Sequence, residues 1–309
     1  MKYDSLERYR DIVDDYAAMI DALERPLPVT GWANPLKTSI AELLERFDAA
    51  GVAYRPLVWK PDGFRFTGPE MMNPGRRIEY LLGHYQIQEE AAMLPVALLG
   101  PKPGDRIVDL CAAPGNKTAQ IAVLANNRGT IVANDRSPTR MRAIRNTLDR
   151  LGIVNVVMTN HDAANFHTPS QRYDSVLADV PCSCEGTSRK NGDALNDAVE
   201  ETVERIGRSQ RAILERAFRI CRPGGRVVYS TCTYAPEENE EVIQDVLERI
   251  PFEPIWVDCN VEGFAASPGL TTWGARDFNP SMAKTIRVWP HQNDTGGFFV
   301  AAWDKPERW

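Results

Sequence analysis

The N-terminal part of the chain combines one helical hydrophobic pattern with several short elements. Residues 1–25 place apolar side chains at helical spacing and stop at the Pro26/Pro28 pair, which predicts an amphipathic helix used for packing or docking. Turn residues then separate the apolar runs. The further elements expected here are one helix and two strands, over residues 39–50, 54–59 and 64–67. We therefore expect a small α+β subdomain over residues 1–77.

From about residue 88 onward, β-branched runs alternate with helical patterns, which is typical of a parallel sheet with crossover helices. Strands are predicted over residues 106–110, 130–133, 154–159, 175–178, 226–230 and 298–303. Helices are predicted over residues 117–125, 138–151, 197–221 and 236–250. The pattern predicts a doubly wound α/β domain over residues 78–309.

The net charge of the chain bears on whether it binds nucleic acid. The 309 residues contain 36 Lys and Arg against 42 Asp and Glu, a net charge of −6, which argues against nucleic-acid binding at the level of the whole chain. Phosphate binding depends on local positive surface, however, and one segment is rich in arginine. Its members are Arg205, Arg208, Arg211, Arg216, Arg219, Arg222 and Arg226. Two interpretations stay open, an RNA-facing stripe or an ordinary solvated helix face.

The six cysteines show no regular disulfide spacing, and most lie in apolar runs, so reduced thiols are expected. The first turns of the sequence carry scattered charges, and no apolar stretch reaches membrane-spanning length. We therefore expect a cytoplasmic protein with no membrane contact. No second Cys or His pair at zinc spacing accompanies Cys182 and Cys184, which argues against a metal site.

A loop of small residues follows the first strand of the predicted α/β domain. It contains a single glycine, Gly115, which excludes a three-glycine dinucleotide fingerprint, and it lacks a Gly-Lys-Ser/Thr phosphate loop. Ligands of doubly wound folds bind at the carboxyl ends of strands, where small residues allow close approach. Asp135 follows the second strand and could bind ribose hydroxyls, and Asp162 follows the third and could bind the adenine amino group. Singly, each Asp could instead cap a turn or a helix.

Two cysteine motifs end the fourth and fifth strands. The fourth strand runs into Asp179 and Cys182, and the fifth runs into Cys232. If both strands neighbour the first, the three side chains converge on one edge of the sheet, beside the small-residue loop. Taken alone, Cys232 fits better a buried cysteine at the end of a strand.

These motifs together resemble the Nop/Sun family of S-adenosylmethionine-dependent RNA cytosine-C5 methyltransferases, over about residues 80 to 303. The resemblance is carried by residues 85–91, the loop 111–117, the Asp-Val-Pro-Cys run, the Ser-Thr-Cys-Thr-Tyr-Ala-Pro-Glu-Glu-Asn run and the tail 287–299. It implies a Rossmann-like seven-stranded class I methyltransferase sheet. Asn116 departs from the family, which usually has a second glycine there.

The resemblance also implies a set of roles. Cys232 would be the nucleophile, Cys182 would help to release the product, and Lys117 and Asp179 would help to hold a flipped-out cytosine. The cofactor site would be lined by Cys111, Ala112, Ala113, Pro114, Gly115, Asn116, Lys117, Asp135, Asp162 and Asp179. The N-terminal subdomain would handle RNA, although residues 27–37 match the family only loosely.

A thiol suits this chemistry because carbon 5 of cytosine is a poor nucleophile until a thiolate adds at carbon 6. Asp179 is the expected acid near ring nitrogen 3. A helix expected from Pro236 would favour a Cys232 thiolate, but Glu237 and Glu238 oppose it, which leaves the balance open.

The expected substrate is RNA, either ribosomal or transfer RNA, and the expected protein is a monomer whose RNA recognition rests on the subdomain and the catalytic surface. Two alternatives remain. A DNA cytosine-C5 methyltransferase would use Cys182 as its nucleophile and would have no need for Cys232. A catalytically silent RNA-binding or ribosome-assembly factor would need neither of these cysteines, nor Lys117 and Asp179.

Overall fold

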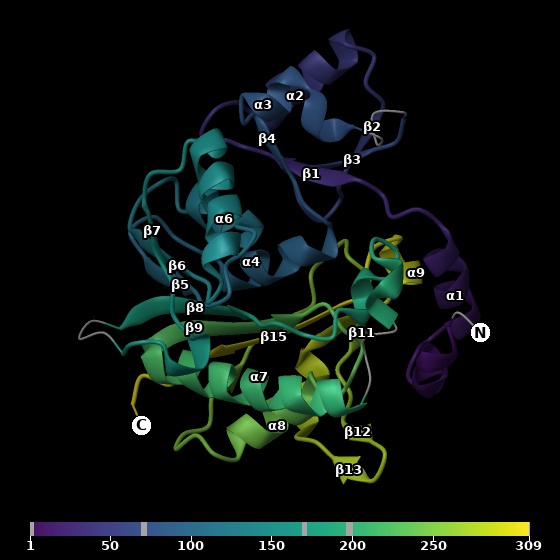
Figure 1. The fold of residues 1–309 in the computed structure, drawn as a ribbon, viewed down its shortest axis with the longest axis vertical. Helices are drawn as coiled ribbons and strands as arrows, with labels where there is room; N and C mark the ends of the chain where they lie inside the picture. The colour runs from purple at the N-terminus through teal and green to yellow at the C-terminus, as the bar shows by residue number, and fades with distance from the viewer. Residues whose placement is uncertain (1–2, 69–72, 169–171, 196–199, 309) are drawn as a thin grey trace.

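A mixed β-sheet forms the centre of the larger part of the molecule (Figure 1). The computed structural model describes residues 3–68, 73–168, 172–195 and 200–308. Seven strands of three or more residues follow one another across this sheet in the order β7-β6-β5-β8-β9-β15-β14. Their bounds are β5 Arg106–Asp109, β6 Thr130–Asn134, β7 Val156–Thr159, β8 Tyr173–Asp179, β9 Cys221–Thr231, β14 Ile286–Val288 and β15 Phe298–Asp304.

Strands β5 to β9 are parallel, whereas β15 runs antiparallel between β9 and β14. Two strands of two residues extend the sheet, β10 (Ile255–Trp256) beside β15 and β11 (Ser267–Pro268) beside β14. The seven-stranded α/β sheet expected from the family resemblance is therefore confirmed. The periodicity missed β14, which is only three residues long.

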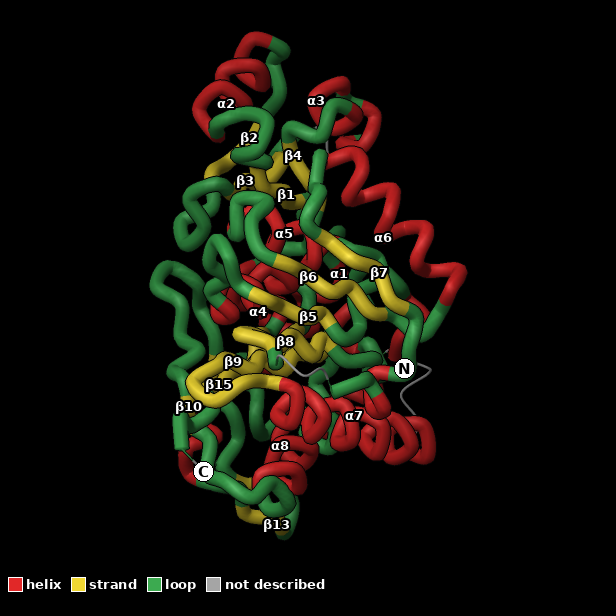
Figure 2. Tube along the Cα trace, turned by 90° about the vertical axis from the view of Figure 1, so that its left-hand side faces the viewer, coloured by secondary structure: helices red, strands yellow, loops and turns green. Residues whose placement is uncertain are grey.

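Helices cover both faces of this sheet (Figures 1 and 2). One face packs against α4 (Leu94–Leu99), α5 (Asn116–Leu124) and α6 (Pro138–Leu151), which share a buried apolar cluster with Ile107 and Val228. The other face packs against α7 (Glu200–Ile220) and α8 (Glu240–Leu247), in a second cluster with Val108 and Val227. Because neighbouring residues of one strand face opposite layers, these strands are apolar on both sides. The predicted start of α7 at residue 197 lies outside the described residues.

The N-terminal subdomain is a four-stranded antiparallel sheet in the order β2-β3-β1-β4. Its strands are β1 Thr30–Ala33, β2 Tyr54–Pro56, β3 Gly63–Phe66 and β4 Tyr85–Ile87, and its helices are α2 Ile40–Ala49 and α3 Ile78–Leu81. Phe47, Phe64 and Tyr85 are fully buried at its centre. Strand β4 lies beyond the boundary expected at residue 77, so this sheet continues into the chain that leads to α4.

The prediction of a single helix over residues 1–25 is wrong. The chain forms a 3-10 helix, η1 (Asp4–Tyr9), and a separate α-helix, α1 (Tyr16–Glu24), whose start is capped because Asp15 accepts a hydrogen bond from the Ala18 N–H. The break allows Leu6 and Tyr9 to pack with Tyr234 and Trp289 in a small separate cluster. Packing against the larger domain therefore overrides the local helical pattern.

The remaining elements are short. They are α9 Pro290–Asn293, β12 Thr272–Trp273, β13 Arg276–Asp277 and the 3-10 segments η3 Pro74–Arg76, η4 Ala91–Met93, η5 Ala163–Asn165, η6 Glu185–Thr187, η7 Gly192–Leu195 and η8 Pro280–Lys284. Among the described residues, no helix has the length and apolar content that a bilayer crossing requires.

The arginine-rich segment 205–226 lies mostly along α7, and five of its seven arginines have partners within the protein, whereas Arg205 and Arg208 are exposed. Arg211 pairs with Asp245, Arg219 with Glu215, and Arg222 with Asp174. Arg226, on β9, pairs with Asp304 at the end of β15. The structure therefore favours the ordinary paired helix face over the RNA-facing stripe.

Candidate active site

A sharp loop joins β5 to α5 at the carboxyl edge of the sheet. Strand β5 ends at Asp109 and α5 begins at Asn116, so the loop of small residues opens directly onto a helix N-terminus. Gly115 has φ +104°, and a Cβ there would lie 3.0 Å from the Ile144 Cα. Both the backbone conformation and the close approach of α6 therefore require glycine at this position.

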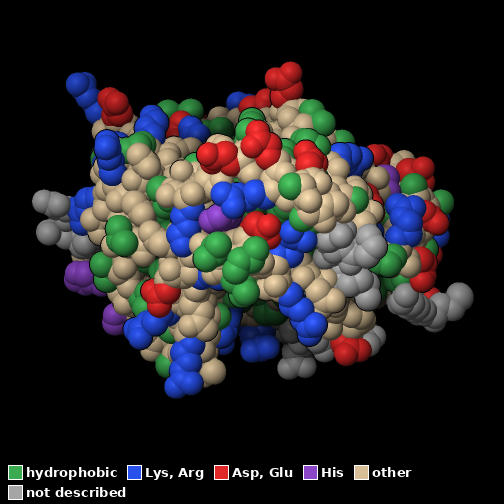
Figure 3. Space-filling view, turned by 90° about the horizontal axis from the view of Figure 1, so that it is seen from above, with side chains coloured by type: hydrophobic (Ala, Val, Ile, Leu, Met, Phe, Trp, Pro, Cys, Tyr) green, Lys and Arg blue, Asp and Glu red, His purple; other side chains and the backbone are tan. Residues whose placement is uncertain are grey.

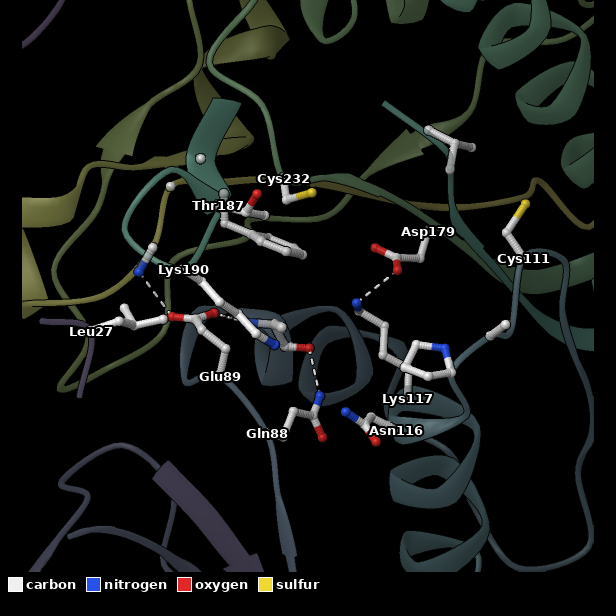
Figure 4. A pocket seen from close by; sticks show the side chains of 18 of the residues that line it. Leu27, Gln88, Glu89, Cys111, Asn116, Lys117, Asp179, Thr187, Lys190 and Cys232 are labelled. Atoms are coloured by element: carbon white, nitrogen blue, oxygen red, sulfur yellow. Dashed lines mark hydrogen bonds and ion pairs between the residues drawn. The ribbon is translucent and has the colours of Figure 1, made fainter. Parts of the chain in front are cut away.

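The loop lines a cavity of about 300 Å³. Figure 4 shows side chains entering it from the loop, from the ends of the strands and from the chain that leads out of the N-terminal subdomain. The predicted residues on its wall are Cys111, Ala112, Ala113, Pro114, Asn116, Lys117, Asp179 and Cys232. Others that the sequence did not single out are Leu27, Gln88, Glu89, Ala92, Asp109, Val180, Gly186, Thr187, Arg189, Lys190, Gly296, Gly297 and Phe298.

Asp109 is the buried acid at the base of this cavity, and its side chain lacks one partner. Its Oδ2 accepts a hydrogen bond from the Thr118 hydroxyl at 2.7 Å, whereas no hydrogen-bond partner of Oδ1 is found among the described residues. Burial raises the pKa of Asp109 to about 7. Its position directly before the small-residue loop was the available signal, but sequence analysis did not single it out.

Three carboxylates surround the start of the loop. Burial raises the pKa of Cys111, and the negative charges of Asp109, Asp179 and Asp135 raise it further. This wall therefore disfavours a thiolate and favours a positively charged ligand.

Asp135 and Asp162, both expected in the cofactor site, are not among the residues that line the cavity. Asp135 is buried, and it accepts hydrogen bonds from the N–H groups of Ala113 and Ser137 at 3.2 and 2.9 Å. It thereby fixes the back of the loop. Asp162 caps a 3-10 turn through the Ala164 N–H at 3.1 Å, which is the capping alternative that the sequence left open. Their contact with a cofactor stays a prediction.

Lys117 and Asp179 form an ion pair inside the cavity, with 2.7 Å between the ammonium nitrogen and Oδ2 (Figure 4). Burial lowers the pKa of Lys117, but the Asp179 carboxylate outweighs this effect and leaves the pKa raised. The second Asp179 oxygen accepts a hydrogen bond from the Ser230 hydroxyl at 2.7 Å. Lys117 therefore stays protonated, and the pair has a fixed orientation.

Asn116, which departs from the family pattern, faces the N-terminal subdomain. Its side-chain oxygen accepts a hydrogen bond from the Gln86 amide at 2.7 Å. Because Gln86 lies on β4, this contact ties the cofactor loop to the four-stranded sheet.

The two predicted cysteines meet at the carboxyl ends of β8 and β9. Their sulfur atoms are 3.3 Å apart, and the Cys232 backbone N–H also donates to the Cys182 sulfur at 3.4 Å. Cys232 lines the cavity, whereas Cys182 does not. A third thiol, Cys184, lies with its sulfur 3.8 Å from that of Cys182. The prediction that Cys182 and Cys232 converge beside the loop is confirmed.

The pKa values of these thiols are linked. Hydrogen bonds with Cys184 and Cys232 raise the pKa of Cys182, and burial adds to this. The hydrogen bond with Cys182 lowers the pKa of Cys232, but the one with Cys184 and burial outweigh it and leave that pKa raised. Cys232 is therefore a thiol at neutral pH. The sequence alone had left open whether Cys232 is a thiol or a thiolate. The helix α8 begins at Glu240, and its N-cap residue Asn239 is hydrogen bonded to Thr231 and Thr233, but the Cys232 pKa is raised all the same.

Buried polar side chains fix the two cysteine loops to each other. Ser183 shares a hydrogen bond of 2.7 Å with the Thr233 hydroxyl, and its N–H donates to Glu238 at 3.0 Å. Glu185 accepts hydrogen bonds from the Thr233 hydroxyl at 2.9 Å and from the Tyr9 hydroxyl at 2.9 Å. The N-terminal segment thus supports the site, a role that sequence analysis missed because these contacts join distant parts of the chain.

A comparison with known protein families identifies the family of this chain. The family model described as "16S rRNA methyltransferase RsmB/F" matches residues 96–304. The chain belongs to this family.

Two relatives show how much of a family member the chain covers. The "Ribosomal RNA small subunit methyltransferase F" of Erwinia tasmaniensis is 34% identical over 293 residues, which cover 93% of this chain and 59% of that protein. The "28S rRNA (cytosine-C(5))-methyltransferase" of Mus musculus is also 34% identical over 293 residues, covering 93% of this chain and 36% of that protein. The chain therefore spans less than two thirds of the length of either relative.

The architecture also matches a solved structure. The crystal structure of a methyltransferase homologue from Pyrococcus horikoshii superposes with a TM-score of 0.85 and 31% sequence identity. The match covers 97% of this chain and 93% of the other. It confirms the Rossmann-like methyltransferase fold, with the N-terminal subdomain included in the aligned region.

Proposed function

We propose that this protein transfers a methyl group from S-adenosylmethionine to carbon 5 of a cytosine in ribosomal RNA, with Cys232 as the nucleophile. One observation carries the proposal. The Cys232 sulfur opens into a cavity that also contains the Lys117–Asp179 ion pair and the small-residue loop. The printed names of the two relatives, a small-subunit ribosomal RNA methyltransferase and a cytosine-C5 enzyme, support the same substrate class.

The residues of the loop fit the proposed cofactor. The buried Asp109 Oδ1 has no hydrogen-bond partner among the described residues and suits an amino group, while the carboxylates around Cys111 suit a sulfonium cation. When bound, S-adenosylmethionine supplies an electrophilic methyl group on sulfur. Cys111 to Lys117 and Asp179 would hold it, with Asp135 behind the loop. Asp162 would reach the adenine only from outside the cavity.

The nucleophilic step follows from the position of Cys232. Its thiol passes its proton to the Asp179 carboxylate, and the sulfur adds to carbon 6 of the flipped-out cytosine. The ring electrons move toward nitrogen 3, where a proton must arrive. Asp179 lines the same cavity as Cys232 and returns the thiol proton to nitrogen 3, while Lys117 stays protonated as its charged partner. Carbon 5 is then nucleophilic enough to take the methyl group.

Product release falls to Cys182. After methyl transfer, carbon 5 still carries a proton, and a base must take it before the bond between Cys232 and carbon 6 breaks. The Cys182 sulfur is 3.3 Å from that of Cys232, close enough to act on the adduct. The electron pair of the breaking bond returns to the Cys232 sulfur, which regenerates the thiolate.

The accessibility of the two sulfurs favours Cys232 over Cys182 as nucleophile. Cys232 is on the cavity wall, whereas Cys182 lies behind it and contacts the other two thiols. A DNA-type enzyme that attacks with Cys182 would need the reverse arrangement. The alternative of a silent binding factor has no support either, because simple binding does not require an ion pair and the Cys232 thiol in one cavity with the Cys182 thiol beside it.

RNA contacts beyond the target base require local positive surface, because the chain as a whole is acidic. Exposed arginines precede and line α6 at positions 136, 140, 142 and 145. Lys and Arg side chains are spread over the face that includes the N-terminal subdomain (Figure 3). We assign RNA handling to this face.

One chain supplies every residue of the site, so a cytoplasmic monomer without a resident metal suffices for the reaction.

Methyl transfer to ribosomal RNA in the presence of labelled S-adenosylmethionine tests the proposal. Cys232→Ala should abolish transfer, and Cys182→Ala should accumulate an RNA–protein adduct that resists denaturation. Cys259→Ala is the matched control, because that thiol is buried in the core and away from the cavity. Bisulfite sequencing of RNA from cells with and without the gene would locate the cytosine. Exchange of the two variant results would support the DNA-type chemistry, and unchanged RNA in every arm would support the silent factor.

A further inference from the structure

We infer that Cys182, Cys184 and Cys232 together form a site for a thiophilic metal ion such as Zn²⁺, and that an ion bound there blocks the nucleophile. The three sulfur atoms all lie within 4.8 Å of one another, and each residue is partly exposed. The binding part of this inference is independent of the reaction, whereas the blocking part rests on the proposed role of Cys232.

The spacing of the sulfurs matches what a metal ion requires. Zinc binds thiolates at about 2.3 Å, so two sulfurs in its tetrahedral shell lie roughly 3.8 Å apart. The sulfurs of Cys182 and Cys184 are 3.8 Å apart, and those of Cys182 and Cys232 are 3.3 Å apart. Small side-chain rotations therefore bring all three sulfurs to one ion without movement of the backbone.

Cys184 stands where its backbone would favour glycine. Its φ is +64°, in the left-handed region that residues with a Cβ rarely adopt. The flanking loop is held in place because Ser183 is hydrogen bonded to Thr233 and Glu238. The backbone N–H of Gly186 also donates to the Cys232 carbonyl at 2.9 Å. The third sulfur is therefore presented by a rigid loop, which favours metal binding by preorganisation.

Charge balance and access also fit a metal ion. The hydrogen bond with Cys182 lowers the pKa of Cys184, so Zn²⁺ displaces protons from Cys182 and Cys232, which pass to solvent, and three thiolates leave a complex with one net negative charge. The Arg140 guanidinium, whose positive charge acts on the Cys184 sulfur, offsets part of that negative charge. Cys232 opens to the cavity, so the ion can enter from there and keep its fourth position for water.

The sequence argued against metal because Cys182 and Cys184 have no second pair at zinc spacing. The fold overcomes this because parallel strands β8 and β9 bring Cys232 beside Cys182 from 50 residues further along the chain. A bound metal would occupy the sulfur that the proposed reaction needs. A metal ion bound at this site would therefore inhibit the reaction and would not serve as its cofactor.

Metal binding is tested on the reduced, metal-free full-length chain by titration with Cd²⁺, using the ultraviolet cadmium–thiolate absorption band. We expect one ion per chain with a band intensity for three sulfurs. Cys184→Gly, which suits the left-handed backbone and preserves the fold, should bind at least about tenfold more weakly. Cys259→Ala should bind like the wild type. Absence of the band, or equal affinity in Cys184→Gly and wild type, would overturn the inference.

A second arm measures methyl transfer to RNA in the presence of Zn²⁺. Wild-type activity should be lost at saturating Zn²⁺ and recovered on chelation, and Cys184→Gly should need at least about tenfold more Zn²⁺ for the same loss. Binding without loss of activity would refute the blocking role. If no methyl transfer occurs in any arm, the proposed function fails, while the cadmium titration still decides whether the site exists.

Discussion

Replacement of Asp109 by Asn should stabilise the cofactor-free protein at alkaline pH and weaken cofactor binding. The two side chains have the same shape, so the variant removes only the buried charge. Burial raises the pKa of Asp109 from 3.8 to about 7, which corresponds to about 4 kcal/mol. Because the folded pKa is raised, this stability is fully present below pH 3.8 and is lost as the pH rises through 7. At pH 8, Asp109→Asn should therefore unfold with a free energy larger by up to about 4 kcal/mol.

Cofactor binding should respond in the opposite direction. A hydrogen bond to a charged group contributes about 1.5–3 kcal/mol, so Asp109→Asn should weaken S-adenosylmethionine binding roughly ten- to a hundredfold at pH 8. The contribution of Asp109 to wild-type affinity should also fall about tenfold between pH 8 and pH 6 as Asp109 takes up its proton. The amino group of the ligand titrates in the same range, but with the opposite effect on binding. Asp109→Asn keeps only that second effect and so isolates the contribution of Asp109.

Urea unfolding at pH 5 and pH 8 measures the stability change, and isothermal titration calorimetry at pH 6 and pH 8 measures binding. The mutant and wild-type proteins should differ in stability at pH 8 and far less at pH 5. Equal stability at both pH values, together with equal affinity for S-adenosylmethionine, would show that Asp109 carries no buried charge that serves the ligand.

Three further substitutions test the supports of the site. Tyr9→Phe removes a hydroxyl donor from the buried Glu185 carboxylate and should lower the free energy of unfolding by about 2 kcal/mol, measured by calorimetry; an unchanged melting temperature would contradict the buried contact. Arg287→Met leaves Glu240 buried without its ion-pair partner and should cost about 3–5 kcal/mol in urea unfolding, whereas a cost below about 1 kcal/mol would show that the pair is not buried. Gly115→Ala forces a side chain into left-handed backbone against α6 and should lower both stability and cofactor affinity; calorimetry and titration that match the wild type would refute the close approach.

The parallel part of the fold could be predicted because its strands are apolar on both faces and its helices are amphipathic. Residues 138–151 formed a helix with the predicted bounds, which begins at Pro138 and ends before Gly152. Strand β14 could not be predicted from periodicity, because three residues carry too little pattern. The N-terminal helix was mispredicted because Leu6 and Tyr9 pack with residues more than two hundred positions away, which no local pattern reveals.

The candidate site likewise contains residues that could be predicted from the sequence and residues that could not. The loop, Lys117, Asp179 and the two cysteines were accessible to sequence analysis because each follows the end of a strand, and the carboxyl ends of parallel strands share one edge. Asp109 was missed because it fell inside the strand predicted over residues 106–110, although β5 ends at this residue, directly before the small-residue loop. Cys184 was noticed only as half of an incomplete metal motif, because its proximity to Cys232 depends on the pairing of β8 with β9.

Peptide mapping by mass spectrometry of the adduct with RNA that contains 5-fluorocytosine tests the central claim most directly. Fluorine replaces the hydrogen that must leave carbon 5 as a proton during product release, and it cannot leave as a cation, so the covalent complex accumulates. The nucleotide should be found on the peptide that contains Cys232, and Cys232→Ala should form no adduct. A nucleotide attached to Cys182, or no adduct with RNA that the enzyme methylates, would contradict the account.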